Sequence, residues 1–487
     1  MHVRVIVPVA LLALVAACAT NPVTGRRELA FMSEAQEISI AQESDPQIKE
    51  EMGVYTDPEL QRYVAEIGQR MAKISERPQL PWRFTVVDVP AVNAFAVPGG
   101  GIYITRGILP FLDSEAELAG VIGHEIGHVT ARHSAQQYTR QVTGQVGLLA
   151  LGIFVPAARP FGELSGQALG VLFLKYGRGD ELQADELGAR YESTLGWDPA
   201  AVPAFLSTLG RLDEAAGDRR GVPNWLSTHP DPLSRVKDIQ PTVERLKAVG
   251  TSAGTSFSTH RDALMQRIDG ILYGDNPEQG LARGSAFLHP VLRFRIDFPD
   301  KWEIANSPRE VVAKAPGADM SMILQLVEKP QGGNIQEIAL NSMGNSGFRA
   351  SQSERGERTS INGLDAFMGV YQGQVEGLGA VVTRAAHIMY DSKVFVVAGL
   401  VAPGAFPQAD KAFVASIRSF RRLSAVEAED IHPDRVDLYI VRAGDTWQSI
   451  AERSGGAVKP ATLAIMNSAT SDSQPQPGTR IKVVVRG

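Results

Sequence analysis

The chain has 487 residues, of which 44% are hydrophobic and 21% are charged, with a formal net charge of −6 at pH 7. This is the composition of a folded globular protein, and the length allows two to four domains. The acidic balance and the lack of a long Lys/Arg run exclude the basic surface that nucleic-acid binding requires, so we expect no nucleic-acid partner.

The N-terminus has the pattern of a targeting segment. Arg4 precedes an apolar run at residues 5–15 that is too short to cross a bilayer as a helix. The run ends in "LVAAC", and Cys18 is the only cysteine of the chain, so no internal disulfide can form. This arrangement resembles a bacterial lipobox, with an ordinary signal peptide as the alternative. The resemblance implies lipidation of Cys18, and Ala19 after it implies an outer-membrane lipoprotein that faces the periplasm.

Three folded units are expected after this segment. The first has apolar residues at helical spacing, with a small sheet or hairpin in "WRFTVVDVPAVNAFAVPGGGIYITRGIL". The second has strand patterns with one or two helices, which predicts an α+β domain, and its "FRIDFPDKW" faintly resembles PsbP-like domains. The expected boundaries are 1–17 for a signal peptide, 18–32 for a lipidated segment, 33–250 for the helical unit, 251–285 for a linker with a short helix, 286–424 for the α+β domain, 425–437 for a linker and 438–487 for the last unit.

Residues 141–173 contain two strongly apolar runs, each shorter than a membrane span and separated by prolines. We expect a helical hairpin in the core beside the site described next. A hydrophobic flap that faces the membrane or a substrate is the alternative.

The stretch "VIGHEIGHVTARH" carries a metal-binding pattern. It lies in a predicted helix that begins at Ser114, and His124 and His128 are four residues apart, so their imidazoles share one face. This spacing suits zinc, and Glu125 is placed to act on a metal-bound water. The alternative, a polar helix face, would bury these side chains without partners. His133 is expected to point away from the ligand face and to be structural.

A third ligand is predicted in "YGRGDELQADELG". Glu181 and Asp185 are also four residues apart, so Glu181 can complete a His-His-Glu set while Asp185 accepts an N–H from a ligand imidazole. The alternative for Glu181 is an acid on a solvated helix surface.

These motifs together resemble the zinc metallopeptidases of the type I CAAX prenyl endopeptidase family, in its soluble bacterial lipoprotein branch (BepA/LoiP-like). The resemblance covers residues 21–245 and rests on "NPVTGRRELAFMSEAQEI", "NAFAVPGGGIYITRGIL", "HEIGH", "ELQAD" and "STHPDPLSR". It implies a mainly α gluzincin-type metalloprotease domain with a small β-sheet, one Zn²⁺ per chain, Glu125 as general base and Glu181 as the third ligand. The serine that usually precedes the motif's arginine is replaced by Gly177.

The resemblance also suggests roles outside the ligand set. His229 would lie over the metal, blocking the open position or touching substrate, and Arg235 would stabilise an oxyanion; an ordinary surface loop is the alternative for both. The "PGGGIYITRG" segment would be an edge strand that pairs with substrate backbone, with a plain hairpin as the alternative. The substrate-binding residues expected there are Gly99, Gly100, Gly101, Ile102 and Tyr103.

The C-terminal "YIVRAGDTWQSIAERSG" and "PGTRIKV" resemble a LysM module of βααβ order, in which Asp445 or Thr446 caps the first helix. The resemblance implies binding to peptidoglycan. A degenerate copy that serves as a packing or protein-contact domain is the alternative.

We therefore expect a lipid-anchored zinc endopeptidase that hydrolyses misfolded or misassembled envelope proteins. The main alternative is a chaperone or assembly scaffold whose metal site is closed by His229. This alternative includes association with peptidoglycan. The intact Glu125 favours the enzyme. A wall hydrolase directed by the LysM-like unit has less support, since only that unit points to the wall.

Overall fold

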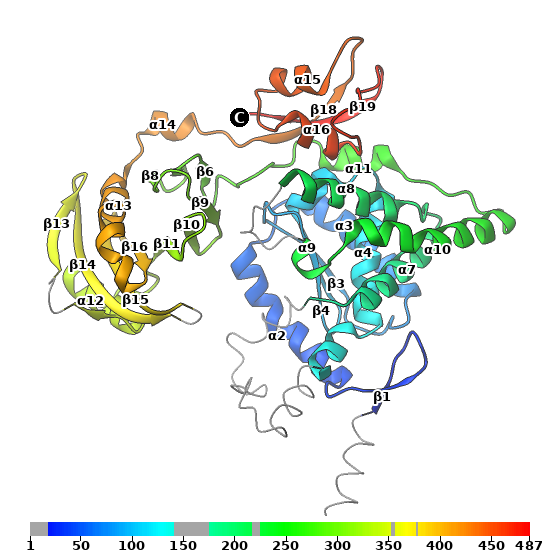
Figure 1. The fold of residues 1–487 in the computed structure, drawn as a ribbon, viewed down its shortest axis with the longest axis horizontal. Coiled ribbons are helices and arrows are strands. Elements are labelled where there is room, and N and C mark those ends of the chain that lie inside the picture. Colours follow the sequence, from blue (N-terminus) through cyan, green and yellow to red (C-terminus); the bar gives the residue numbers. More distant parts are fainter. Residues whose placement is uncertain (1–17, 141–174, 217–224, 352–355, 376–377) are drawn as a thin grey trace, which may run out of the picture. The chain divides into compact units, whose positions relative to one another are not determined.

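The computed structural model describes residues 18–140, 175–216, 225–351, 356–375 and 378–487 (Figure 1). The chain forms two compact units: residues up to Tyr273 with Asp434–Arg486, and residues Gly274–Pro433. The expected signal peptide and the apolar runs of residues 141–173 lie outside the described residues. Within the described part, no helix is both long and apolar enough to cross a membrane.

The first unit is mainly helical, as predicted. Its long helices bury apolar residues every three or four positions; in α3 these include Leu60, Val64 and Met71, each 0% exposed. The helices are α2 (Glu34–Met52), α3 (Pro58–Ile74), α4 (Glu115–Thr130), α7 (Arg178–Thr194), α8 (Ala201–Ala216), α9 (Trp225–Thr228), α10 (Pro232–Ser252) and α11 (Arg261–Ile268), with the 3₁₀ turn η1 (Arg106–Phe111) and the hairpin of β1 (Cys18–Thr20) and β2 (Arg27–Leu29).

A three-stranded sheet packs against these helices. Its order is β3 (Arg83–Val87), β5 (Gly101–Thr105) and β4 (Ala94–Val97), with β3 parallel and β4 antiparallel to β5. The prediction that Gly99–Tyr103 forms an edge strand is therefore wrong, because β5 is paired on both sides. Its five residues are all buried, as a central strand requires, and Gly99 and Gly100 instead form the turn from β4, with φ angles of 95° and 109°.

The predicted linker at residues 251–285 also needs correction. Helix α10 extends to Ser252, and α11 belongs to the first unit, because Leu264 and Ile268 are both 0% exposed in its core. A short helix with a buried apolar face is part of a domain, so the boundary falls at Gly274.

The second unit is the predicted α+β domain, built on antiparallel strands. The larger sheet has the order β12 (Arg349–Ala350), β14 (Leu364–Val375), β15 (Gly379–Tyr390), β16 (Lys393–Val401), β11 (Met320–Leu326), β10 (Glu310–Lys314) and β9 (Glu303–Asn306), and β13 (Glu357–Ile361) also pairs with β14. The smaller sheet has the order β17 (Arg421–Arg422), β8 (Phe294–Asp297), β7 (Ala286–His289) and β6 (Leu281–Arg283).

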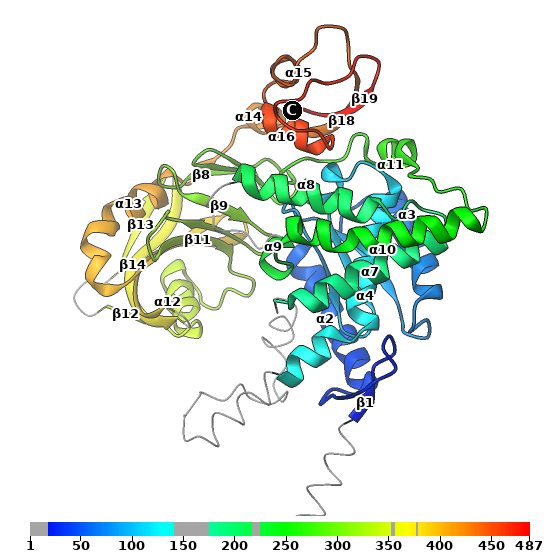
Figure 2. The same ribbon diagram turned by 45° about the vertical axis from the view of Figure 1, so that its right-hand side comes forward.

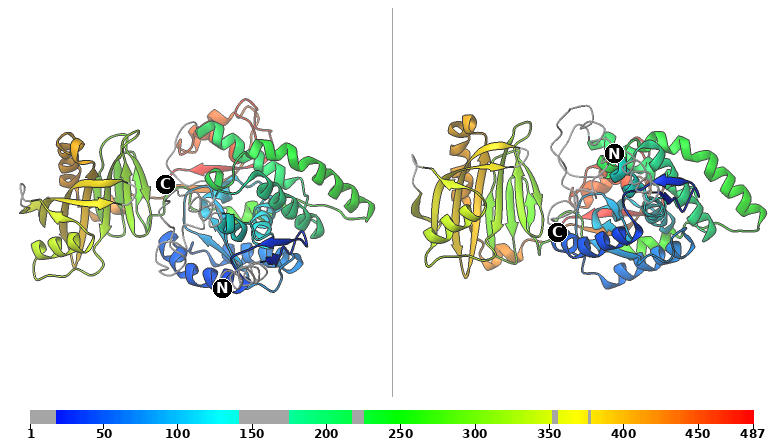
Figure 3. Two further views of the ribbon diagram at one scale, coloured as in Figure 1. Left: turned by 60° about the horizontal axis from the view of Figure 1, so that its bottom comes forward. Right: turned by 90° about the horizontal axis from the view of Figure 1, so that it is seen from below.

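Helices cover both faces of the larger sheet. In α12 (Ile335–Asn345), Ile338 packs with Phe367, whereas in α13 (Phe406–Ser419), Phe413 packs with Met368. Because adjacent residues of a strand point to opposite faces, the two helices lie on opposite sides of the sheet (Figure 3). The turn η2 (Pro403–Ala405) precedes α13, and α14 (Ala425–Glu429) follows β17.

The C-terminal residues have the predicted βααβ order: β18 (Arg435–Ile440), α15 (Trp447–Arg453), α16 (Pro460–Met466) and β19 (Arg480–Val485), with β18 antiparallel to β19. Thr446 is the N-cap of α15, and its side chain accepts a hydrogen bond from the Ser449 N–H. We expected these elements to form a separate third unit. They instead belong to the same compact unit as residues up to Tyr273.

A buried lysine joins the C-terminal residues to the helical part. The Lys482 side chain is 0% exposed, and its Nζ donates to the Leu112 carbonyl at 2.5 Å and lies 3.6 Å from Asp113 Oδ1. Around it, Met466 and Val484 pack with Phe111. The contact lies directly before α4, the helix that carries the HEIGH motif.

Replacing Lys482 with Ala should destabilise the first unit by about 2 kcal/mol, since the buried Leu112 carbonyl loses its hydrogen-bond donor. Urea unfolding monitored by tryptophan fluorescence measures this. Lys459→Ala is the matched control, because Lys459 is an exposed lysine of the same unit. Equal midpoints for the two variants would contradict the assigned role of Lys482.

Candidate metal centre

The site depends on the close approach of α4 and α7, which lie side by side in two views (Figures 1 and 2). A Cβ added to Gly123 would lie 3.0 Å from Gly188 Cα, and one added to Gly127 would lie 3.0 Å from Ala184 Cα. Helix separation is set by the side chains at the contact, so small residues here allow the backbones to approach. This packing places the start of α7 beside the HEIGH face of α4.

Four side chains meet at this contact. His124 and His128 come from α4, Glu181 from the first turn of α7, and His229 directly follows α9. One potential ligand atom of each lies within 4.8 Å of the others, and all four are buried. The structure thus brings together the predicted ligands and also His229.

The distances fit a divalent metal. His124 Nε2 lies 3.0 Å from His128 Nε2 and 3.7 Å from Glu181 Oε2, and His128 Nε2 lies 3.6 Å from Glu181 Oε1. Ligand atoms about 2.1 Å from a tetrahedral ion would be roughly 3.4 Å apart. The donor set of two imidazoles and a carboxylate is also one that divalent transition metals prefer.

A buried ion-pair network fixes the ligands. Asp185 Oδ1 lies 2.8 Å from His124 Nδ1, the contact expected from the sequence, which leaves His124 Nε2 facing the other ligands. Arg235 of α10 binds Asp185 through Nε and Nη2, and its Nη1 lies 2.5 Å from Glu181 Oε2. Burial would raise the pKa of Asp185, but Arg235 and His124 lower it to about 2. Arg235 thus favours the charged form of Asp185, and His229 together with Arg235 lowers the pKa of Glu181.

The same contacts bear on the expected role of Arg235. Its guanidinium is 3% exposed and faces Asp185 and Glu181. Arg235 therefore lies where it can orient the two acids. Its expected contact with an oxyanion stays a prediction.

His133 belongs to the site, contrary to the expectation that it points away. Its Nδ1 lies 2.9 Å from His128 Nδ1, and its Nε2 lies 2.9 Å from Gln183 Oε1. Helical spacing failed here because α4 ends at Thr130 and Arg132 has a φ of 61°, which turns the chain back. His133 therefore holds the orientation of a ligand ring.

Tyr176 is a second residue that the sequence reasoning missed. Its ring stacks on His128 with centroids 3.9 Å apart and an interplanar angle of 24°. Its hydroxyl contacts Ser134 Oγ at 2.9 Å. The only feature of the sequence that could have placed Tyr176 at the site is its position directly before Gly177, at the start of the helix that carries ELQAD.

Glu125 is buried beside the ligands without a hydrogen-bond partner. It is 1% exposed, and neither carboxylate oxygen has a partner among the described residues. Burial raises its pKa. The nearest titratable side chain recorded is His229, whose Nε2 lies 3.6 Å from Glu125 Oε1. An unpartnered carboxylate of this kind is available to take up and release a proton.

Known proteins share these motifs. Residues 58–243 match the model of peptidase family M48, and residues 439–484 match that of the LysM domain. The chain is 29% identical over 248 residues to the beta-barrel assembly-enhancing protease of Escherichia coli (strain K12), covering 49% of this chain and 50% of that protein. It is 32% identical over 225 residues to mitochondrial metalloendopeptidase OMA1 of Schizosaccharomyces pombe, covering 45% of this chain and 64% of that protein.

The chain spans about half the length of the assembly-enhancing proteases that it matches. Among solved structures, cyanobacterial PsbP of Synechocystis sp. PCC 6803 aligns with a TM-score of 0.23 and 13% identity, covering 29% of this chain and 95% of that one. The expected PsbP-like character of the second unit stays a prediction.

Replacing His133 with Ala should weaken metal binding by about 10- to 100-fold while leaving one site per chain, because His128 loses the group that orients it. Titration of the chelator-stripped protein against a chromophoric metal indicator measures both affinity and stoichiometry. Exposed His260, changed to Ala, is the control. Unchanged affinity in His133→Ala would remove His133 from the site.

Proposed function

We propose that this chain, which carries a peptidase family M48 domain and a LysM domain, is a zinc-dependent endopeptidase. The observation that supports this best is the unpartnered carboxylate of Glu125 beside a complete set of ligand side chains. A binding protein would gain nothing from a buried acid without a partner, which costs free energy to maintain.

The donor set favours zinc held by His124, His128 and Glu181. A zinc ion there would supply Lewis acidity towards the scissile carbonyl and would make water a competent nucleophile near neutral pH. Glu125 takes a proton from the attacking water at a carboxylate oxygen and delivers it to the leaving amine nitrogen. Burial raises the pKa of Glu125, which strengthens it as a base.

Other residues of the chain hold this arrangement in place. Asp185 and His133 fix the two imidazoles through their second ring nitrogens. Arg235 keeps Asp185 and Glu181 charged, so the ligand set retains its negative charge. The edge strand β4 packs against α4, and its four residues are all buried.

We assign the enzyme to the periplasmic face of the outer membrane, anchored by lipidated Cys18, with misfolded or misassembled envelope proteins as substrates. The lipobox-like "LVAAC" supports the anchor. The name of the relatives, beta-barrel assembly-enhancing protease, supports the substrate class. The LysM domain supports attachment to peptidoglycan.

The position of His229 favours a closed resting site. Its Nδ1 lies 2.9 Å from Glu181 Oε1 and 3.3 Å from His124 Nε2, which is the distance of a fourth ligand. A closed site is also what the second candidate function, a scaffold or chaperone, would need. The two candidates differ in whether removing His229 releases hydrolysis.

Glu125→Gln should lower the rate of casein hydrolysis at least 100-fold, because the amide cannot accept the proton, while the bound metal is retained. His229→Ala should raise the rate several-fold, since the fourth position opens. Both rates are measured by release of fluorescent peptide from labelled casein.

The exposed Glu244, changed to Gln, is the control for loss of a carboxylate elsewhere. The double variant Glu125→Gln/His229→Ala should be as inactive as Glu125→Gln. If His229→Ala hydrolysed no casein while binding one metal ion, the scaffold would be the better interpretation.

The full chain should sediment with purified peptidoglycan sacculi and be released by soluble chitin oligosaccharides, because LysM binding recognises N-acetylated sugars. The full chain is required, since Lys482 packs into the helical part. Sedimentation with cellulose, an insoluble glycan that lacks the N-acetyl groups, is the matched control. Equal recovery with both pellets would make the C-terminal residues a packing domain.

A further inference from the structure

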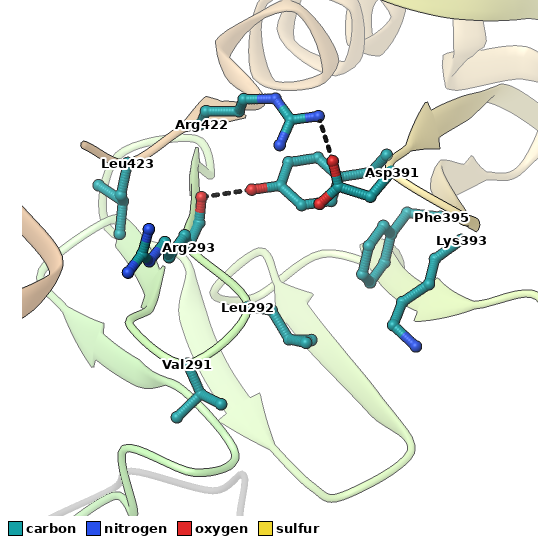
Figure 4. A pocket seen from close by; sticks show the side chains of 9 residues that line it. Val291, Leu292, Arg293, Asp391, Lys393, Phe395, Arg422 and Leu423 are labelled. Atoms are coloured by element: carbon teal, nitrogen blue, oxygen red, sulfur yellow. Dashed lines mark hydrogen bonds and ion pairs between the residues drawn. The ribbon is translucent and has the colours of Figure 1, made fainter. Parts of the chain in front are cut away.

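The second unit contains a cavity of about 390 Å³. It lies between the turn from β7 to β8, the turn from β15 to β16 and the short strand β17 (Figure 4). None of the metal-site residues belongs to this unit. The volume is in the range of ligand pockets and is enough for one large side chain with its backbone.

The floor of the cavity is apolar. Tyr390 is 3% exposed and Phe395 is 4% exposed, and Leu423 is buried beside them. The Tyr390 hydroxyl donates to the Arg293 carbonyl at 2.6 Å, so the polar atom of this ring is already satisfied and the ring offers carbon to a ligand. Leu292 stands at the centre of the cavity wall (Figure 4).

The rim carries more positive than negative charge. Arg422 is paired with Asp391 at 2.8 Å and stacks over the Tyr390 ring, with its guanidinium carbon 4.2 Å from the centroid. Arg293 and Lys393 are exposed, and neither has an ion-pair partner among the described residues. Their charged ends lie on opposite sides of Leu292 (Figure 4).

We propose that this cavity binds the C-terminal residue of a polypeptide that ends in an aromatic or large aliphatic side chain. The side chain occupies the apolar floor, and the terminal carboxylate pairs with Lys393 or Arg293. The Asp391 carboxylate accepts a backbone N–H of the same peptide. The site therefore recognises a free chain end and not an internal segment.

The rim decides between a peptide and a fatty acid. A fatty acid has a carboxylate and an apolar chain but no hydrogen-bond donor, so it cannot offer Asp391 the N–H that a peptide provides. A peptide offers an amide donor to Asp391 and a carboxylate to the cations. The choice of a peptide also rests on the proposed function, in which polypeptides are the substrates. Binding by one end raises the effective concentration of the rest of the chain for proteolysis.

The test uses the full chain carrying Glu125→Gln, so that the probe is not cleaved. Fluorescence anisotropy measures binding of a labelled ten-residue peptide ending in Phe, with a free carboxylate or as its C-terminal amide. We expect amidation to raise Kd at least tenfold. The double variant Arg293→Glu/Lys393→Glu should raise the Kd of the free acid at least tenfold and leave that of the amide within twofold.

The control is Lys411→Glu, a charge reversal at an exposed lysine of α13, which should leave both Kd values within twofold. Both rim side chains are exposed, and an unchanged urea midpoint verifies that the double variant is folded. Equal binding of acid and amide would overturn the proposal. Binding of decanoate with no binding of the peptide would also overturn it, in favour of a fatty-acid site. The anisotropy assay measures binding without cleavage. If the wild-type chain failed to hydrolyse casein, that result would therefore refute the proposed function but not the peptide site of the second unit.

Discussion

The close contact between α4 and α7 is the constraint on which the metal centre depends. Gly123 and Gly127 on one helix meet Gly188 and Ala184 on the other at distances that leave no space for a side chain. Only this approach brings Glu181 within 4 Å of both imidazoles. A larger side chain at the contact would separate the helices and leave two histidines and an acid buried apart, which would cost stability as well as metal binding.

The network around the ligands shows how a buried site keeps its charges. Burial would raise the pKa of Asp185 and of Glu181. Arg235 lowers the pKa of Asp185, and His229 together with Arg235 lowers that of Glu181. The same guanidinium is kept charged by these acids. The same contacts that orient the two acids therefore also favour their charged forms. Glu125, which has no such partner, is left with a raised pKa and with a different task from its neighbours.

The sequence predicted which side chains cluster at the candidate metal centre because local spacing determines this: residues four apart on a helix share a face whatever surrounds them. It failed where the chain leaves regular structure. His133 reaches His128 only because Arg132 adopts a left-handed conformation after the helix ends. The role of β5 as a central strand depends on a second pairing, with β3, and a run such as "GIYIT" does not distinguish a central strand from an edge strand. The cavity of the second unit joins two turns and a strand that are far apart along the chain, so no motif announces it.

The ammonium group of Lys482 sits inside the helical part, against the carbonyl of Leu112, immediately before the helix that carries the two metal-binding histidines. Because this contact is buried, a displacement of the C-terminal residues would move the start of α4 with them. If the C-terminal residues bind a glycan strand, as we propose, the side-chain cluster of the candidate metal centre would lie at a fixed distance from that strand.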